Sequence, residues 1–222
     1  MSYSSTDKLS QASTIDSLAQ STLLRPNPHL AHALSNSQKH GLPPIAISPL
    51  QGQYLSVQCR LLGAKSVLEI GTLGGYSTLC FAETGAKVTS IEINPRHQAV
   101  ALENISAAGH DAEMILGAAL DVLPKLEQEG RKFDMVFIDA DWERQGEYFD
   151  WAVRLTRAKG GIYVDNVVRQ LLESETTDAG TESLMTKVGR DERVTATLVP
   201  TVSSHRGMAG AAFDGFLLAV VH

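Results

Sequence analysis

The segment Val67-Leu68-Glu69-Ile70-Gly71-Thr72-Leu73-Gly74-Gly75-Tyr76-Ser77 is a short apolar run with one carboxylate that ends at a cluster of glycines. Continuous apolar runs are typical of parallel strands that are buried on both faces. Glycine has no Cβ, so the chain can turn tightly there and a ligand can approach the backbone closely. The segment therefore predicts a strand, a tight loop and a helix, with a nucleotide-like cofactor at the loop. A loop that only turns the chain is the alternative.

The spacing of these glycines differs from that of dinucleotide-binding loops. A G-x-G-x-x-G pattern that starts at Gly71 would require glycines at the positions of Leu73 and Tyr76. The loop therefore has no evident site for a pyrophosphate. This argues against a nicotinamide-dependent oxidoreductase.

An acidic residue follows the loop at the distance that is typical of ribose recognition. Residues 87–93 form a second apolar run, and Glu92 lies near its C-terminal end, about 20 residues after Gly71. A carboxylate there can accept hydrogen bonds from both ribose hydroxyls. Ribose recognition without a pyrophosphate loop favours S-adenosylmethionine, and Glu69 fits the same site. A lysine partner for Glu69 is the alternative.

Apolar runs alternate with helical patterns along the rest of the chain. Further strands are expected at 112–116, 133–139, 160–165, 193–199 and 215–221, and helices at 49–61, 77–83, 95–108 and 178–190. This alternation predicts an α/β fold, in which a mostly parallel sheet has helices on both faces and ligands gather at the C-terminal ends of the strands. Four acidic residues are expected at that edge: Glu69, Glu92, Asp139 and Asp165.

Two of the expected helices have a defined apolar face. Ser48, Pro49 and Gln51 predict a helix start, with Ser48 as the N-cap and Gln51 completing a capping box. The buried face of this helix is expected at helical spacing, at Leu50, Tyr54, Val57 and Leu61. The helix that begins at Pro95 is expected to bury Ala99, Leu102 and Ile105.

Length and charge limit the class of protein. The chain has 222 residues and 43% hydrophobic content, which fits a single domain over 1–222, with an N-terminal helical cap at 1–44 and a catalytic α/β core at 45–222. A net charge of −6 argues against nucleic acid and membrane as partners, because both call for clustered Lys and Arg. A small molecule is expected instead. Cys59 and Cys80 lie in apolar segments, and residues 1–20 lack a secretory signal pattern, so a cytoplasmic protein without disulfides is expected.

Three segments together carry a family resemblance. They are 67–77, Phe137-Ile138-Asp139-Ala140-Asp141 and Tyr163-Val164-Asp165-Asn166. With them the chain resembles the metal-dependent class I O-methyltransferases, typified by catechol and caffeoyl-CoA O-methyltransferases. The likeness runs from about Ile45 to Gly161 and resumes at Asp165-Asn166. It implies a Rossmann-like class I methyltransferase fold, with a seven-stranded, mostly parallel sheet that has one antiparallel strand, and it implies a homodimer.

The resemblance also implies where the cofactor binds. The segment before Pro49 closes over the cofactor in that family, which makes Ile47 a backbone contact, and Gly117-Ala118-Ala119-Leu120 lies where the family places its adenine. An ordinary turn from strand to helix is the alternative for these alanines. The residues implied for S-adenosylmethionine are Ile47, Glu69, Gly71, Thr72, Tyr76, Ser77, Glu92, Ala118, Ala119, Asp139, Asp141 and Tyr148.

A metal site is expected at Asp139, Asp165 and Asn166. Their carboxylate and amide oxygens are hard donors that suit Mg²⁺, or Mn²⁺ or Ca²⁺. In the resembled family such an ion binds two vicinal hydroxyls of the acceptor and acidifies one of them before in-line transfer of the methyl group. The alternative is structural, with an Asp-Asn turn after one strand and an aspartate that caps the helix after the other.

One position departs from the family pattern. The family has a lysine after Asp-Ala-Asp, which is the general base in its catechol branch, whereas Trp142 follows Asp141 here. An indole N–H can only donate, so Trp142 cannot accept a proton. Deprotonation is then expected from the metal, from solvent, or from His205 in residues 201–212, which we interpret as a substrate lid. Trp142 either stacks on an aromatic acceptor or only packs at the start of the next helix.

A second departure lies after the Asp-Asn pair, where Arg169 replaces a common aromatic residue. The acceptor pocket is therefore expected to differ from that of the family. The sequence predicts a metal-assisted S-adenosylmethionine-dependent O-methyltransferase that acts on a small hydroxylated, aromatic acceptor. The alternative is a non-catalytic S-adenosylmethionine-binding protein that has lost the catalytic lysine.

Overall fold

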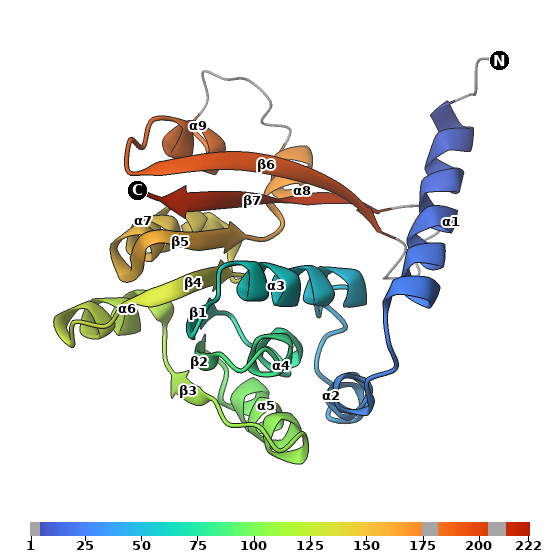
Figure 1. The fold of residues 1–222 in the computed structure, drawn as a ribbon, viewed down its shortest axis with the longest axis horizontal. Coiled ribbons are helices and arrows are strands. Elements are labelled where there is room, and N and C mark those ends of the chain that lie inside the picture. The colour runs from blue at the N-terminus through green and yellow to red at the C-terminus, as the bar shows by residue number, and fades with distance from the viewer. Residues whose placement is uncertain (1–4, 175–181, 204–211) are drawn as a thin grey trace.

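Seven strands form one twisted sheet at the centre of the molecule (Figure 1). A computed structural model describes residues 5–174, 182–203 and 212–222, with side chains from residue 11 onward. The strands are β1 (Ser66–Ile70), β2 (Lys87–Glu92), β3 (Glu113–Leu116), β4 (Phe133–Ile138), β5 (Thr156–Val164), β6 (Val194–Ser203) and β7 (Ala212–Val221). Their order in the sheet is β3-β2-β1-β4-β5-β7-β6. The strands β1 to β5 pair in parallel, and β7 is antiparallel to both of its neighbours. The predicted fold class is confirmed.

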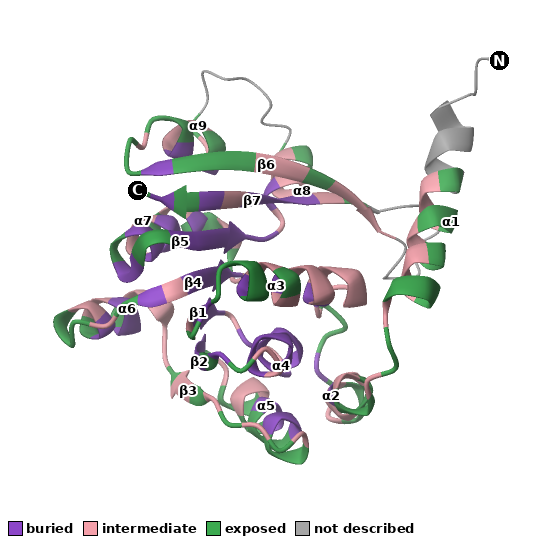
Figure 2. Ribbon diagram, in the orientation of Figure 1, coloured by how far each residue is buried: buried purple, intermediate pink, exposed green. Residues whose placement is uncertain are grey.

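Helices cover both faces of this sheet (Figures 1 and 2). They are α1 (Ser5–Leu23), α2 (Pro28–Lys39), α3 (Pro49–Leu61), α4 (Tyr76–Ala82), α5 (Pro95–Ala107), α6 (Ala119–Gln128), α7 (Gln145–Leu155), α8 (Val167–Glu173) and α9 (Leu184–Gly189), with a 3₁₀ turn η1 (Trp142–Arg144). One face packs against α3 and α4, and the other packs against α6, α7 and α9. Within the described residues, no helix is long and apolar enough to cross a membrane.

The central strands are apolar on both sides because both faces are covered. Side chains alternate along a strand, so Met135 and Phe137 of β4 face α3 and α4, while Val136 and Ile138 face α6 and α7. All four are at most 1% exposed. The continuous hydrophobic run that predicted this strand is therefore explained by burial on two sides.

The helix α3 begins where the sequence predicts, but it buries a different face. The Ser48 hydroxyl accepts a hydrogen bond from the Gln51 backbone N–H at 3.2 Å, which confirms the predicted cap. The buried residues are Gly52, Leu55 and Cys59, whereas Val57 and Leu61 are 44% and 76% exposed. The predicted face was wrong because α3 carries apolar residues all round, so the contact with the sheet decides which of them are buried.

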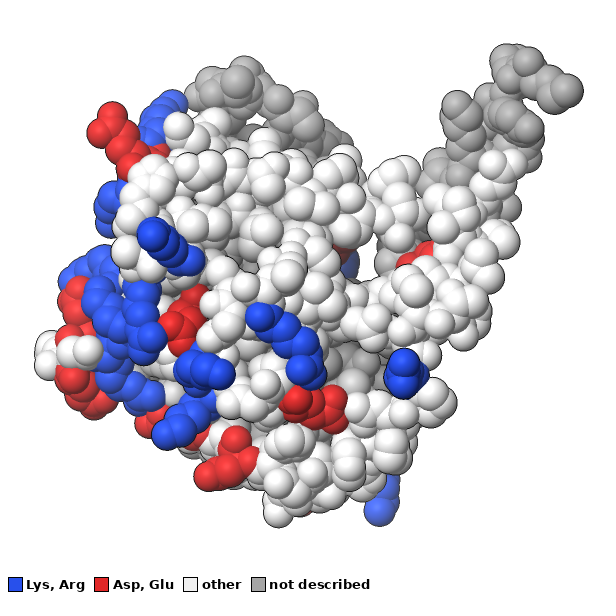
Figure 3. All heavy atoms as spheres, viewed as in Figure 1, with Lys and Arg blue, Asp and Glu red and all other residues white. Residues whose placement is uncertain are grey.

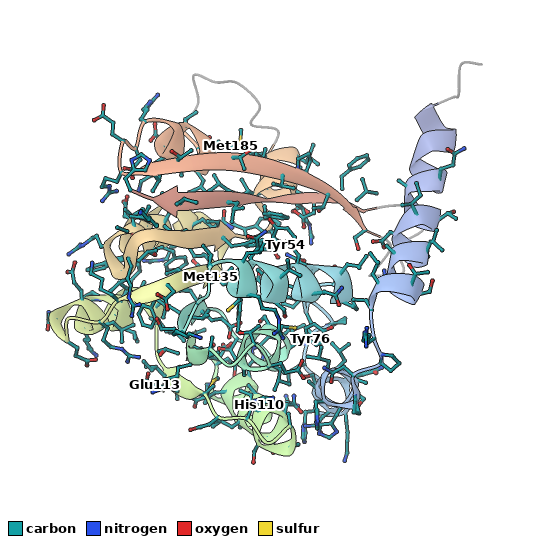
Figure 4. The ribbon with its side chains drawn as sticks, in the orientation of Figure 1. Tyr54, Tyr76, His110, Glu113, Met135 and Met185 are labelled. Carbon is teal, nitrogen blue, oxygen red and sulfur yellow. The ribbon has the colours of Figure 1, made fainter. Side chains whose placement is uncertain are left out.

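Tyr54 belongs to the part of the predicted face that does pack. It lies between α3 and the sheet (Figure 4), with ring centroids 5.0 Å from Phe216 and 6.1 Å from Tyr163. The predicted capping box is not formed, since the Gln51 amide donates instead to the Tyr163 hydroxyl at 3.0 Å and to Asp165 Oδ1 at 2.6 Å. A residue expected to stabilise a helix start therefore reaches the end of β5.

The helix α5 also turns a different face inward. Ile105 is buried as predicted, whereas Leu102 is 45% exposed and Ala99 is also exposed. Asn104 is fully buried, because its amide donates to the Gly74 carbonyl at 2.8 Å and its side-chain oxygen accepts from Asn36 at 2.9 Å. The spacing of apolar residues cannot identify a buried polar residue such as Asn104.

Several boundaries differ from the predictions. The strand β5 starts at Thr156 rather than near residue 160, and α6 and α8 were not predicted. Residues 201–203 belong to β6 and residue 212 to β7, so a lid over 201–212 is wrong for these positions. The remaining part, 204–211, which contains His205, lies outside the described residues, as do residues 178–181 of the predicted helix 178–190.

Replacing one leucine from each side of α3 tests which face supports the fold. Leu55→Ala should lower the free energy of unfolding by about 2–5 kcal/mol, because it opens a cavity at a residue that is 0% exposed. Leu61→Ala on the same helix should change it by less than about 0.5 kcal/mol, since that side chain is in solvent. Urea denaturation measures both. Equal losses would contradict the assignment of the buried face.

Candidate active site

A cavity of about 1600 Å³ opens at the carboxyl ends of the parallel strands. The loop from Gly71 to Gly75 and the end of β2 form one part of its wall, and the ends of β4 and β5 form another. Residues of α2 and of the segment 42–46 lie over it, and Trp142 and Arg169 line its far side. This is the edge at which an open parallel sheet binds its ligands.

Gly71 is the point at which the first strand meets its neighbours. Its φ is +95°, and a Cβ at this position would lie 2.0 Å from the Asp139 carbonyl oxygen. The Gly71 N–H donates to the Ile91 carbonyl at 3.0 Å, and the Asp139 N–H donates to the Ile70 carbonyl at 2.9 Å. A side chain at Gly71 would therefore separate β1 from β4 directly beneath the cavity.

Glu69 lies beneath the loop and does not line the cavity. Its carboxylate is 0% exposed and accepts hydrogen bonds of 2.5 Å from the hydroxyls of Ser77, Thr78 and Ser90. Burial raises the pKa of Glu69 to about 7, although the three hydroxyls favour the charged form. The carboxylate ties β1, β2 and α4 together, which gives it an organising position rather than a place on the cavity wall.

Glu92 lines the cavity and also holds the loop in place. Its Oε2 accepts from the backbone N–H of Thr72 at 3.2 Å and of Leu73 at 2.8 Å, and its Oε1 accepts from Asn94 N–H at 2.9 Å. The ring of His97 also lines the cavity, with Nδ1 3.6 Å from Oε1. A carboxylate offers about four acceptor sites, so these three N–H groups leave room for about one strong hydrogen bond to a ligand.

Most of the predicted cofactor residues come together around this cavity. Lining residues are Gly71, Thr72, Tyr76, Ser77, Glu92, Ala118, Ala119, Asp139, Asp141 and Tyr148. Ile47 is not among the lining residues, and its side chain is buried in the core with α3 and α4, whereas Ile45 and Ala46 line the cavity. The backbone contact implied for Ile47 stays a prediction. The segment 117–120 is held beside β2 by a hydrogen bond from Gly117 N–H to the Glu92 carbonyl at 2.9 Å.

The residues predicted for a metal lie at the ends of β4 and β5. Asp165 is buried, and its Oδ1 accepts from Gln51. Burial, and then the charges of Asp139 and Asp214, raise the pKa of Asp165 well above its usual range. Asn166 has a φ of +59°, and its amide donates to Asp214 Oδ2 at 2.9 Å. Asp214 of β7, which the sequence did not single out, thus adds a third carboxylate next to the pair.

The oxygen atoms of Asp139, Asp165 and Asn166 are suitable ligands for a divalent cation. They do not form a cluster of three acidic or imidazole side chains, because one of the three is an amide. Among the described residues, no group of three His, Cys, Asp or Glu side chains is placed to hold a metal ion. The expected set has two carboxylates and one amide, and its excess negative charge is what a cation would offset. Gln145 lies beside it, donating to the Asp165 carbonyl at 2.9 Å, and its buried Oε1 has no hydrogen-bond partner in the described structure.

The far side of the cavity carries an indole and two guanidinium groups. Trp142 of η1 lines the cavity together with Arg144 and Arg169. The guanidinium carbon of Arg169 is 5.4 Å from the centroid of the Trp142 ring. Asp141 accepts a hydrogen bond of 2.5 Å from the Tyr148 hydroxyl, and burial, with the Asp141 contact, raises the pKa of this tyrosine. His205 lies outside the described residues, so its predicted role stays a prediction.

Known proteins match this chain along most of its length. A family model described as O-methyltransferase matches residues 21–206. A catechol O-methyltransferase of Mycobacterium tuberculosis is 41% identical over 216 residues, which cover 93% of this chain and 94% of that protein. An O-methyltransferase structure from Bacillus cereus in complex with SAH superposes with a TM-score of 0.85 at 33% identity, and covers 96% of this chain and 100% of that one. The O-methyltransferase TomG from Streptomyces achromogenes, in complex with SAM, has a TM-score of 0.82 at 32% identity, with 96% and 98% covered.

The raised pKa of Glu69 predicts how stability depends on pH. Between its ordinary value of 4.5 and about 7, the native state binds more protons at Glu69 than the unfolded state does. The free energy of unfolding should therefore fall as pH rises through this window. Glu69→Gln has no carboxylate to titrate at this position, so its free energy of unfolding should not fall in this way. Measured by urea denaturation, the stability of the variant relative to the wild type should rise by up to about 3 kcal/mol between pH 5 and pH 8.

A second glutamate serves as the control for this measurement. Glu113 has a lowered pKa, mainly because Arg131 binds it, so it stays charged over the same range. The difference between Glu113→Gln and the wild type should therefore be constant from pH 5 to pH 8. If the difference in free energy of unfolding between Glu69→Gln and the wild type is also constant over this range, the pKa of Glu69 is not raised.

Proposed function

The chain belongs to the O-methyltransferase family, and from that premise we propose that it is a metal-assisted enzyme that methylates a hydroxyl of a small phenolic acceptor. The chain itself is an S-adenosylmethionine-dependent O-methyltransferase. The observation that carries the proposal is the cavity. It joins the Glu92 and glycine-loop wall to a second wall with Asp139, Asn166 and Trp142. A cofactor on the first wall and an acceptor on the second would meet between them.

The adenosine of the cofactor would lie between the glycine loop, Glu92 and residues 117–120. Glu92 has about one strong acceptor position left toward the cavity, which suits one ribose hydroxyl. His97 beside it lines the same wall and supplies a partner for the second hydroxyl. Ala118 and Ala119 have no side chain beyond Cβ, so they leave room for a flat ring. Glu69 then contributes by fixing the loop from below.

The metal would be held by Asp139, Asp165 and Asn166. When bound, the ion would supply Lewis acidity to an acceptor hydroxyl. Gln51 donates to Asp165 and Asn166 donates to Asp214, so these contacts orient the side chains of the site before any ligand arrives. The negative charge that raises the pKa of Asp165 supports a cation at this place.

Among the described residues that line the cavity, there is no lysine to act as base. Trp142 offers a donor and a flat ring, and a phenol stacked on it would gain about 0.5–1.5 kcal/mol beyond the area buried. Asp141 lines the cavity, and its Oδ1 accepts a hydrogen bond from the Tyr148 hydroxyl. Well-oriented reactants can contribute on the order of 7–11 kcal/mol to lowering the barrier. We therefore propose that this enzyme relies on placement of the acceptor rather than on a lysine base.

We also propose a homodimer and a reducing compartment such as the cytoplasm. The helix α1 extends away from the body of the molecule (Figure 1), with Ile15, Leu18 and Leu23 each about 60% exposed. Few charged side chains cover the described part of α1 or the visible surface over β6 and β7 (Figure 3). Exposed apolar surface of this kind favours contact with a second chain. Cys59 and Cys80 are both buried free thiols, which supports a reducing environment.

Cofactor affinity tests the role of Glu92. Glu92→Gln should weaken S-adenosylhomocysteine binding by about 10- to 140-fold, because hydrogen bonds to a charged acceptor contribute about 1.5–3 kcal/mol. Isothermal titration calorimetry measures the affinity, and thermal melting without ligand separates binding from stability. Glu103→Gln, at an exposed residue of α5, is the control and should bind like the wild type. Unchanged affinity in Glu92→Gln would refute the assignment.

Removal of divalent ions tests the metal. Activity with a catechol acceptor should be lost in EDTA and restored by Mg²⁺ or Mn²⁺, because the ion would acidify the hydroxyl. Asp165→Asn should abolish this metal stimulation without weakening S-adenosylhomocysteine binding, since Asp165 is buried and does not itself line the cavity. Asp111→Asn, at an exposed position, should respond to metal as the wild type does. Full activity in EDTA would exclude the proposed metal.

A further inference from the structure

We propose that the acceptor carries a carboxylate, and that Arg169 binds this carboxylate where it lines the cavity beside Trp142. This inference rests on the proposed function and names the class of acceptor for the same site. It starts from Arg169, which follows Asn166 by three residues and lines the cavity beside Trp142.

The position of Arg169 is determined by contacts on both sides. It lies in the first turn of α8, which begins directly after Asn166, and its backbone N–H donates to Asp214 Oδ1 at 3.3 Å. The next residue, Gln170, donates from its amide to the Trp142 carbonyl at 3.0 Å. The helix α8 and the turn η1 are thereby joined, and the Arg169 guanidinium is held 5.4 Å from the Trp142 ring.

The guanidinium still has donors to offer to a ligand. Its Nε donates to Glu173 Oε1 at 2.7 Å, and no other hydrogen bond of this guanidinium occurs within the residues that the structure describes. Its two terminal nitrogens therefore remain for a ligand. The side chain is 35% exposed and lines the cavity. An exposed pair such as Arg169 with Glu173 contributes little to stability, so folding alone does not account for an arginine here.

The cavity is lined by charges of both signs. The acidic lining residues are Glu92, Asp121, Asp139 and Asp141, and the basic residues Arg144 and Arg169 line it beside Trp142. The Arg144 side chain is 53% exposed, and its guanidinium lies 3.7 Å from the Glu147 carboxylate. This loose, exposed ion pair leaves the positive charge of Arg144 accessible at the cavity. A neutral phenol has no need of two guanidinium groups. A planar guanidinium matches a carboxylate with two parallel hydrogen bonds.

These features describe an acceptor with two chemically different ends. Its hydroxyls would face Asp139 and Asn166, its ring would stack on Trp142, and its carboxylate would meet Arg169. A dihydroxybenzoate has this arrangement, with the acid group on the ring edge away from one of its hydroxyls. Arg169 thus acts as a determinant of specificity for a phenolic acid over a neutral phenol.

The test compares 3,4-dihydroxybenzoate with 3,4-dihydroxybenzamide, a neutral acceptor of the same shape. The full-length protein with S-adenosylmethionine and Mg²⁺ should show a kcat/KM for the acid about tenfold or more above that for the amide, chiefly through KM, because hydrogen bonds between charged groups are the stronger ones. Arg169→Gln should abolish this ratio, and Arg169→Lys should retain part of it. Arg190→Gln, at an exposed arginine that follows α9 and pairs with Glu182, should keep the wild-type ratio.

The outcomes separate this inference from the proposed function. Equal kcat/KM for the acid and the amide in the wild type overturns the inference, while methylation of both supports the proposed function. If neither is methylated, calorimetry with the S-adenosylhomocysteine complex decides: tighter binding of the acid that is lost in Arg169→Gln supports the inference, and no preference overturns it. If Arg169→Gln weakens S-adenosylhomocysteine binding and leaves the acid-to-amide ratio unchanged, Arg169 binds the cofactor's own carboxylate and the inference is overturned.

Discussion

The close approach of Gly71 to the Asp139 carbonyl is the constraint on which the site depends. Since a Cβ at Gly71 would come within 2.0 Å of that oxygen, only glycine lets β1 and β4 stay paired to the point where both strands end. That pairing brings the glycine loop of β1 next to Asp139 of β4. Glu92 then fixes the loop from the other side, through the N–H groups of Thr72 and Leu73. One small residue thus sets the distance between the glycine loop and the residues that we propose for the metal.

Buried carboxylates perform different tasks in this structure because their surroundings differ. Glu69 is enclosed by three hydroxyl donors and serves as a structural link. Glu92 keeps capacity for a ligand while holding the loop. Asp165 lies close to Asp139 and Asp214 and has no cationic partner among the residues that the structure describes, which is costly unless a proton or a cation compensates for it. A carboxylate is therefore surrounded by hydroxyl donors at one strand end and left without a cationic partner, among the described residues, at another.

Periodicity located the elements of this fold better than it located their faces. The strands and the start of α3 follow from apolar runs and from the Ser48 cap, which depend on neighbours in sequence. The inward faces of α3 and α5 were wrong at Leu61 and Leu102, because both helices offer more than one apolar stripe. Asn104 is buried because Gly74 and Asn36 meet its amide, and those partners come from distant parts of the chain. The Gln51 side chain likewise does not complete the expected capping box, because its amide donates to Asp165, 114 residues away in sequence.

The sequence by itself determined the family, the parallel sheet and most of the cavity wall, because these depend on local runs and on motifs at strand ends. Ten of the twelve residues expected at the cofactor do line the cavity, since the carboxyl ends of neighbouring parallel strands must meet at one edge. Only the tertiary structure decided that Glu69 lies beneath the loop, that the Ile47 side chain points into the core, and that Asp214 lies beside Asn166 and Asp165. It also decided that Arg144 and Arg169 flank Trp142. These relations join residues from separate elements, and their distances depend on packing that no local pattern specifies.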